Sequence, residues 1–141
     1  MKEENNYSIQ GRKNRNRGRV FESKVRADLE SKDWIVAKWA NQVDLENNKL
    51  VPAKHKFNFF TKVMAMGTGF PDFIAFKKIG IDNVIIGVES KVGKYLDKIE
   101  KVKAQWLLDN KIFSEIRIAY KDSSSIKYRN FLDTKNIPKG L

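Results

Sequence analysis

Residues 69–91 read GFPDFIAFKKIGIDNVIIGVESK, and this stretch decides the fold. Its runs at 71–76 and 84–91 are rich in β-branched and aromatic residues and flank a turn at 80–83, which predicts two consecutive strands. Strands joined by so short a connection usually pair with each other. The apolar first half of the second run indicates burial on both faces, as in the middle of a sheet. We therefore expect an antiparallel pair near the centre of a sheet.

Three side chains that could take part in catalysis or bind a metal lie at the open end of this pair. Glu89 and Lys91 are two positions apart on a strand, so they leave the same face about 7 Å apart. Antiparallel pairing brings Asp72, at the start of the first strand, beside them. Ser90 between them should point into the packing on the opposite face. We expect Asp72, Glu89 and Lys91 to converge.

These residue types suit hydrolysis of a phosphodiester. Two carboxylates are hard oxygen ligands for Mg²⁺, with Mn²⁺ as a substitute. A bound cation polarises phosphate and helps to form hydroxide from water. A lysine can orient or help to deprotonate that water and can stabilise charge in the transition state. The alternative is a structural ion pair between Glu89 and Lys91 at the exposed end of a strand, and spacing alone does not decide between the two.

The elements before the hairpin are predicted with decreasing clarity. An apolar stripe of Phe21, Val25 and Leu29 predicts a helix over 19–31, with Glu22 at the edge of that stripe. The run at 34–39 is typical of a strand. We expect a hairpin that turns at 47–48 and then a strand near 56–64.

After the hairpin, the chain predicts helix, strand and helix. Asp97 and Glu100 resemble a capping box, which opens a helix to about residue 110 with Ile99, Val102 and Trp106 on one side. Residues 115–120 alternate as in a strand, and 123–132 predict a last helix. A strand, a helix and a strand in succession indicate a parallel pair in a mixed sheet.

We therefore expect an α/β protein with a central mixed β-sheet flanked by helices. Residues 19–141 form a single domain with an insert at about 41–66, and residues 1–18 form a flexible basic arm. The length of 141 residues is typical of one domain.

The charge of the chain points to a polyanionic partner. Lys and Arg number 28 against 17 acidic residues, a formal net charge of +11. Such a balance favours nucleic acid first and an anionic membrane second, against the alternative of a generally solvated basic surface. The cations expected to hold the DNA backbone are Arg12, Lys13, Arg15, Arg17, Arg19, Lys54, Lys56 and Lys94.

Several classes of site are excluded or disfavoured. The chain has no cysteine, so it has neither disulfides nor thiolate metal sites. Its single histidine, His55, lacks the partners of a catalytic or metal-binding pattern and is expected to be structural or to contact phosphate. No apolar run approaches the roughly 20 residues that span a bilayer, and the N-terminus is not typical of a secretion signal. We expect the protein in the cytoplasm, or in the host cytoplasm if it is viral.

The pattern as a whole resembles the PD-(D/E)XK nucleases. Gly69-Phe-Pro-Asp72 followed by Gly87-Val-Glu89-Ser-Lys91 is similar to their signature. RGRVFESKVRADLESKDWIV, at 17–36, resembles the first helix and strand of the archaeal-type Holliday junction resolvases and their viral and phage relatives. The resemblance implies a restriction-endonuclease-like core. It spans roughly residues 18–122, but 41–66 matches poorly.

The resemblance also implies roles for single residues. Asp72 and Glu89 match the metal ligands, Lys91 matches the catalytic lysine, and Glu22 matches a glutamate of the first helix that joins the metal site. The carbonyl of Ser90 would be a further ligand, and Gln105 is the counterpart of a glutamine in the following helix. Resolvases are twofold dimers that act in DNA recombination and repair, so the resemblance implies a homodimer.

Three functions therefore remain open after the sequence. The first is a metal-dependent DNA endonuclease, resolvase-like, acting on branched or duplex DNA. The second is a non-catalytic DNA-binding protein on a nuclease fold. The third is a restriction or nicking nuclease with a sequence preference.

Overall fold

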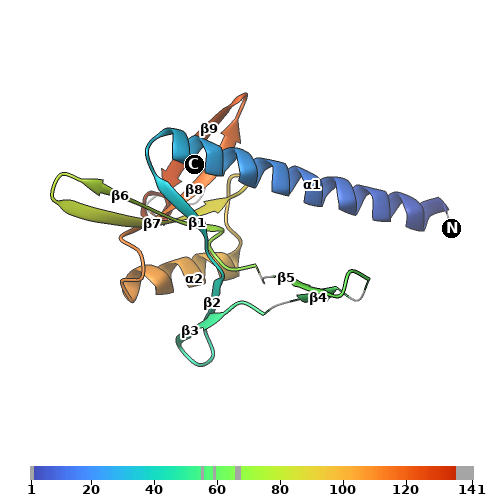
Figure 1. Cartoon of the computed structure of the whole chain (residues 1–141), viewed down its shortest axis with the longest axis horizontal. Coiled ribbons are helices and arrows are strands. Elements are labelled where there is room, and N and C mark those ends of the chain that lie inside the picture. The colour runs from blue at the N-terminus through green and yellow to red at the C-terminus, as the bar shows by residue number, and fades with distance from the viewer. Residues whose placement is uncertain (1, 55, 59, 66–67, 136–141) are drawn as a thin grey trace.

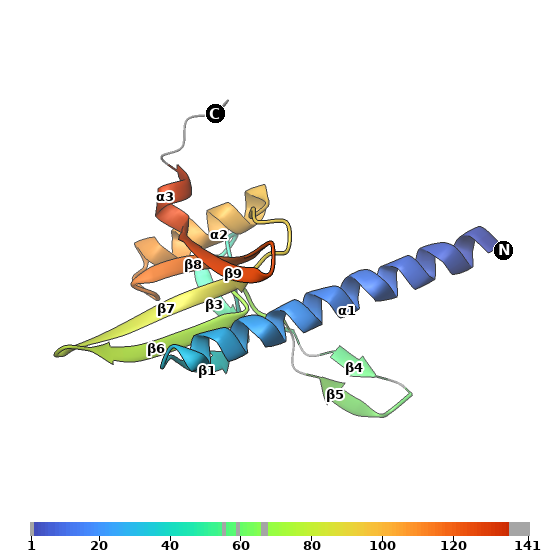
Figure 2. The ribbon, with the colours of Figure 1, turned by 90° about the horizontal axis from the view of Figure 1, so that it is seen from above.

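The computed structural model describes residues 2–54, 56–58, 60–65 and 68–135. The chain is an α/β protein built around a five-stranded mixed sheet in the order β1-β6-β7-β8-β9. Helix α1 lies on one face of this sheet and α2 on the other (Figures 1 and 2). The strands of the sheet are β1 (Ile35–Lys38), β6 (Phe73–Ile79), β7 (Asp82–Ser90), β8 (Glu115–Asp122) and β9 (Ser125–Asn130). The helices are α1 (Lys2–Ser31), α2 (Lys98–Asp109) and α3 (Phe131–Lys135).

The predicted hairpin and the parallel pair are both confirmed. Strands β6 and β7 are antiparallel, with Phe73 opposite Val88, so Asp72 and Glu89 lie just beyond the last paired residues. Strand β8 runs parallel to β7 and follows it through α2. The sheet thus places the end of β7 between the start of β6 and the middle of β8.

Two apolar cores lie on the two faces of the sheet. The predicted stripe of Phe21, Val25 and Leu29 is buried in the first core, against residues of β6 and β7 that include Ile86 and Val88. The second core lies on the α2 side and contains Val43, Phe70, Leu96, Ala104, Leu107, Phe113, Ile116, Ile118 and Phe131. Since Ile86 and Val88 face α1, their neighbours Gly87 and Glu89 face α2.

Helix α1 is longer than the sequence indicated. It begins at Lys2 instead of near residue 19, so the basic run at 11–19 is helical. At about 1.5 Å per residue its 30 residues span about 45 Å, and its N-terminal part extends past the sheet (Figure 2). The apolar stripe occupies only the C-terminal part, so the periodicity that predicted the helix could not reveal its start.

Helix α2 has two apolar sides, and one of them packs against the sheet. Ala104 and Leu107 are fully buried against the sheet, whereas Ile99 and Val102 are 63% and 50% exposed. The sequence placed Ile99, Val102 and Trp106 on one side of this helix, and the contact with the sheet is made by a second apolar side that contains Ala104 and Leu107. The small side chain of Ala104 lets the helix approach closely.

The insert and the C-terminal region contain more β-structure than expected. Strands β2 (Asn41–Asp44) and β3 (Lys49–Pro52) form the predicted hairpin around residues 47–48. The single strand predicted near 56–64 is instead a pair, β4 (Lys56–Asn58) and β5 (Val63–Ala65). The helix predicted over 123–132 was wrong for most of its length, because β9 precedes the short α3. His55 lies outside the described residues.

Among the described residues, no helix has the length and apolar character needed to cross a membrane.

Candidate functional site

The open end of the β6–β7 hairpin brings Asp72 and Glu89 together, as predicted. The backbone N–H of Asp72 donates a 3.0 Å hydrogen bond to Oε1 of Glu89. Glu89 is 6% exposed and is the one charged residue that is buried among those described. The close packing of the two strands leaves no space for a side chain at Gly87, where a Cβ would lie 2.7 Å from Cγ of Pro71. Pro71 precedes Asp72, so this tightly packed point lies next to the residue that carries the carboxylate.

Ser90 holds the carboxylate of Asp72. Its backbone N–H and its hydroxyl donate to the same oxygen, Oδ2, at 2.9 and 2.6 Å. The sequence placed the Ser90 side chain in the packing of the opposite face, and its hydrogen bond to Asp72 was not predicted. Ser90 belongs to the same face of β7 as Ile86 and Val88, so the carboxylate of Asp72 contacts a residue of the face opposite Glu89. No described residue donates a hydrogen bond to Oδ1, which leaves this oxygen available to a ligand.

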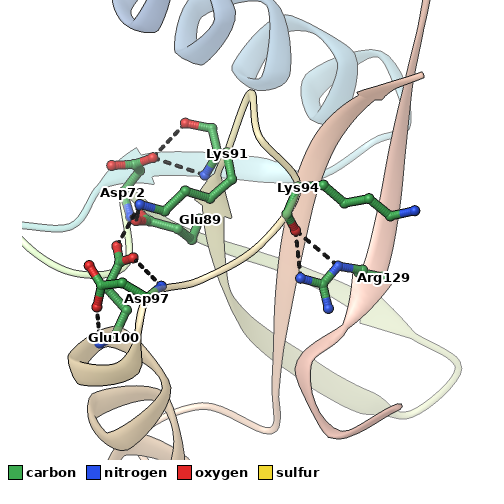
Figure 3. Close-up of polar contacts among 8 residues, drawn as sticks. Asp72, Glu89, Lys91, Lys94, Asp97, Glu100 and Arg129 are labelled. Atoms are coloured by element: carbon green, nitrogen blue, oxygen red, sulfur yellow. Dashed lines mark hydrogen bonds and ion pairs between the residues drawn. The ribbon is translucent and has the colours of Figure 1, made fainter. Parts of the chain in front are cut away.

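Lys91 joins the same site but its closest partner was not predicted. Its Nζ lies 2.8 Å from Oε2 of Glu100 and 3.9 Å from Oε2 of Glu89. Figure 3 shows Lys91 reaching across to the first turn of α2. The simple alternative of a Glu89–Lys91 ion pair is thus the weaker of two contacts. Sequence reasoning placed Glu100 in a capping box with Asp97, which the structure confirms. Glu100 also lies in the first turn of the helix that follows Lys91. This closeness in sequence was the one signal for its contact with Lys91.

The surroundings of Glu89 disfavour its charged form. Burial, followed by the charge of Asp72 and a hydrogen bond with the carboxyl of Glu100, raises the pKa of Glu89 to about 10. The ammonium of Lys91 opposes this rise but does not cancel it. Carboxyls that are crowded and buried become acidic again when a cation binds between them. Burial and the neighbouring carboxylates thus favour the protonated form of Glu89 when no cation is bound.

Lys91 remains a cation in this environment. Partial burial lowers the pKa of Lys91, but the hydrogen bond and charge of Glu100 outweigh it and the net shift is upward. A lysine with a raised pKa is a poor base near neutral pH. A raised pKa suits the role of stabilising negative charge better than that of deprotonating water.

Glu22 approaches Asp72 from the other face of the sheet. It lies on α1, half-buried, and burial together with the charge of Asp72 raises the pKa of Glu22. Glu89 faces α2, so the two glutamates flank Asp72 instead of facing each other. Glu22 is thus close enough to Asp72 for their charges to interact.

The donor set fits a cation that needs few protein ligands. Among the described residues no group of three or more acidic or histidine side chains is arranged to hold a metal ion. Mg²⁺ is commonly bound by one or two carboxylates and completes its shell with water and substrate phosphate. Asp72 and Glu89, with the Ser90 carbonyl that the resemblance implies, would provide such a partial shell.

Gln105 does not join this site. It is five residues after Glu100 and so about 140° further round α2. Its Nε2 donates to Oδ1 of Asp109 at 2.8 Å, and its side chain lines a separate groove with Trp106. The role that the resemblance implied for Gln105 therefore has no geometric support. The residue of α2 that does reach the site is Glu100.

The cations expected to bind DNA are distributed over three places. The run Arg12, Lys13, Arg15, Arg17 and Arg19 is exposed along α1. Lys94 is exposed in the loop after Lys91, where its Nζ lies 5.0 Å from the ring centre of Tyr120. Lys54 is exposed beyond β3, and the side chain of Lys56 lies outside what the structure describes.

Comparison with known proteins adds no assignment. The chain matches no family model, no curated protein and no solved structure. Conclusions about its function therefore depend on the residues and geometry described above.

Proposed function

We propose that this protein is a metal-dependent endodeoxyribonuclease whose site is formed by Asp72, Glu89 and Lys91. One observation carries the proposal: Asp72 and the buried Glu89 are in direct contact at the end of a sheet, with an ammonium 3.9 Å from Glu89. The resemblance to the PD-(D/E)XK nucleases gives the same three residues, and the basic charge of the chain suits a DNA substrate.

Each residue has a separate task in this proposal. Asp72, fixed by Ser90, and Glu89 hold the cation, and Glu22 adds negative charge from the α1 side. Bound Mg²⁺ or Mn²⁺ would polarise the scissile phosphate and promote ionisation of the attacking water. Lys91 stabilises the charge that accumulates on the phosphate, and Glu100 keeps Lys91 protonated and pointed at Glu89. The carboxylates remain rigid because backbone and hydroxyl donors from the strands bind them.

Cleavage of defined DNA substrates tests the proposal. Purified protein is incubated with a four-way junction, a flap and a linear duplex, with Mg²⁺, with Mn²⁺ or with EDTA. We expect cleavage of at least one substrate that requires the divalent ion and is lost in Asp72→Asn. Asp82→Asn is the matched control, because this exposed aspartate lies at the turn end of the same hairpin. Absence of cleavage by the pure protein on all three substrates would refute the enzyme.

The choice among substrates refines the proposal. A resolvase-like enzyme cuts the junction in symmetric pairs, which requires a twofold dimer. The exposed Ile99 and Val102 on α2 support a second subunit on that side of the molecule. Sedimentation at the assay concentration tests this part separately. A monomer that cuts DNA would remove the resolvase assignment and retain the nuclease. Cut positions on varied duplexes then test for a sequence preference.

The non-catalytic alternative makes a different prediction. A DNA-binding protein on a nuclease fold binds DNA in a salt-dependent way, and its binding survives Asp72→Asn with no hydrolysis in either form. The intact set of Asp72, Glu89 and Lys91, with a buried acid that costs stability when unpaired, favours the enzyme.

A further inference from the structure

A groove lies between α1 and the loop that follows the candidate site. It has a volume of about 620 Å³ and is bordered by α1, by Val92 and by the end of β8. Val92 comes directly after Lys91, and Phe21 comes directly before Glu22. The groove therefore opens beside the candidate site without including its carboxylates. Four cations and no acidic residue line it: Lys13, Arg17, Lys24 and Lys121.

These four cations lack anionic partners in the described part of the chain, where none of them forms an ion pair. Glu22, the acid nearest in sequence to Lys24, does not line the groove, and two other neighbouring acids are already paired. Asp122 pairs with Lys127 at 2.6 Å, and Asp28 pairs with Lys32 at 2.9 Å. Four exposed like charges along one groove repel one another, and a bound polyanion removes that repulsion.

The spacing of the cations suits a regular chain of phosphates. Lys13, Arg17 and Lys24 recur at intervals of four and seven residues, which places them on one side of α1. They rise over about 16 Å of helix, and a strand of duplex DNA presents about one phosphate per 3.4 Å of its axis. Arg12 and Arg15 belong to the same basic run but do not line the groove.

We propose that this groove is a binding site for the phosphate backbone of nucleic acid, with Lys24 and Lys121 as members in addition to Lys13 and Arg17. The groove holds the backbone without reading bases. Binding of nucleic acid in the groove does not depend on the proposed nuclease function. The further step, in which the groove presents DNA to Asp72 and Glu89, rests on that function. All charged residues that line the groove are cations, so we expect the affinity to depend on salt through counterion release.

Binding of a fluorescent duplex is measured by anisotropy over a range of salt concentrations, in EDTA so that no cleavage can occur. The test variant carries Lys13→Gln, Arg17→Gln, Lys24→Gln and Lys121→Gln. The control variant carries the same loss of charge at four exposed lysines elsewhere, as Lys49→Gln, Lys78→Gln, Lys98→Gln and Lys101→Gln. Circular dichroism checks that both variants remain folded.

We expect the test variant to lose at least about tenfold in affinity near 0.1 M salt and the salt slope to fall by about 3 to 4, since each phosphate contact contributes about 0.9. The control should stay within about threefold of the wild type. Equal losses in both variants, or a wild-type slope in the test variant, would overturn the proposal. If the test variant is unfolded, the double variants described next decide.

A comparison of two double variants distinguishes the groove from the rest of the basic run. Lys24→Gln with Lys121→Gln removes two groove cations, and Arg12→Gln with Arg15→Gln removes two from the run outside it. The groove proposal expects the first pair to weaken duplex binding more. The reverse order would overturn it. Vesicles rich in phosphatidylserine provide the remaining comparison. Loss of vesicle binding with unchanged DNA binding in the first pair would assign the groove to a membrane surface instead.

Discussion

The two ends of the β6–β7 hairpin have opposite characters. At the open end an acidic side chain, Glu89, is buried beside Asp72. At the turn end Ile81 is 95% exposed and Ile79 is 52% exposed. Stability alone favours the reverse, with apolar side chains inside and carboxylates in water. A single hairpin thus combines a destabilising acid at one end with unprotected apolar side chains at the other.

This difference teaches where the requirements of folding and function separate. The middle of the hairpin, with Ala75, Ile86 and Val88 fully buried, supplies the stability. The buried acid accepts a hydrogen bond from the backbone N–H of Asp72, and in the proposed function a bound cation would neutralise it. Substitutions at the two ends should therefore have different signatures, and the following predictions are ordered by the size of the expected effect.

Glu89→Gln should have the largest effect on activity, a loss of about 100-fold or more, because it removes a metal-binding charge. The same change should stabilise the fold. The pKa of Glu89 is raised to about 10, so in the wild type the unfolded state binds fewer protons than the native state from about pH 4.5 upward. The free energy of unfolding therefore falls as pH rises through this window.

Urea unfolding in EDTA at pH 5 and pH 8 measures this. We expect Glu89→Gln to gain more stability over the wild type at pH 8 than at pH 5. Added Mg²⁺ should stabilise the wild type at pH 8 and leave Glu89→Gln unchanged. A variant that is less stable than the wild type at both pH values would contradict the description of Glu89 as a destabilising acid.

Gly87→Ala should have the next largest effect, a destabilisation of about 1 to 3 kcal/mol. The added methyl would lie 2.7 Å from Pro71 and 3.1 Å from the ring of Phe113, so Pro71 must move and carry Asp72 with it. Gly80→Asn is the matched change at the turn end. Gly80 has a φ of +64° and open space around it, which Asn tolerates. Equal melting temperatures for the two variants would show that the open end is not tightly packed.

Glu100→Gln should reduce turnover about tenfold with little change in KM, because Lys91 loses its 2.8 Å partner but stays in the site. Without that charge the pKa of Lys91 falls, since the contact with Glu100 is a main cause that raises it. The high-pH limb of the pH–rate profile should then move to lower pH. A purely structural role for Glu100 would alter stability and leave the shape of the profile unchanged. Asp109→Asn, at the other end of α2, is the control.

Ile81→Lys should have the smallest effect, within about 0.5 kcal/mol of the wild-type stability, because its side chain is surrounded by water. Cleavage should also be unchanged. A measurable loss of stability, or a change in sedimentation, would mean that the turn end packs against another subunit.

Much of the fold could be predicted because its signals are local. The β-branched runs, the turn at Gly80 and the stripe on α1 each follow from the spacing of a few residues. The convergence of Asp72, Glu89 and Lys91 was predictable because a short turn and antiparallel pairing fix the register of the strands. The parallel pairing of β8 followed from the handedness and length of a strand–helix–strand connection.

The features that were missed depend on contacts distant in sequence. The first part of α1 has no apolar stripe, and β9 was mistaken for a helix because pairing with β8 outweighed the spacing of Ile126, Phe131 and Leu132. Gln105 was placed in the site by resemblance, whereas the rotation of α2 against the sheet brings Glu100 there. That rotation is set by Ala104 and Leu107, and sequence offered two apolar stripes without showing which one packs.

The edge strand β9 has a consequence beyond closing the sheet. Nε of Arg129 on this strand donates a 3.1 Å hydrogen bond to the carbonyl of Lys94 (Figure 3). Lys94 has a φ of +77° in the loop between Lys91 and Asp97. This hydrogen bond fixes the loop between Lys91 and Asp97 to β9, a strand that contains no acidic residue. Replacement of Arg129 would therefore free the loop beside the candidate site and leave all of its carboxylates in place.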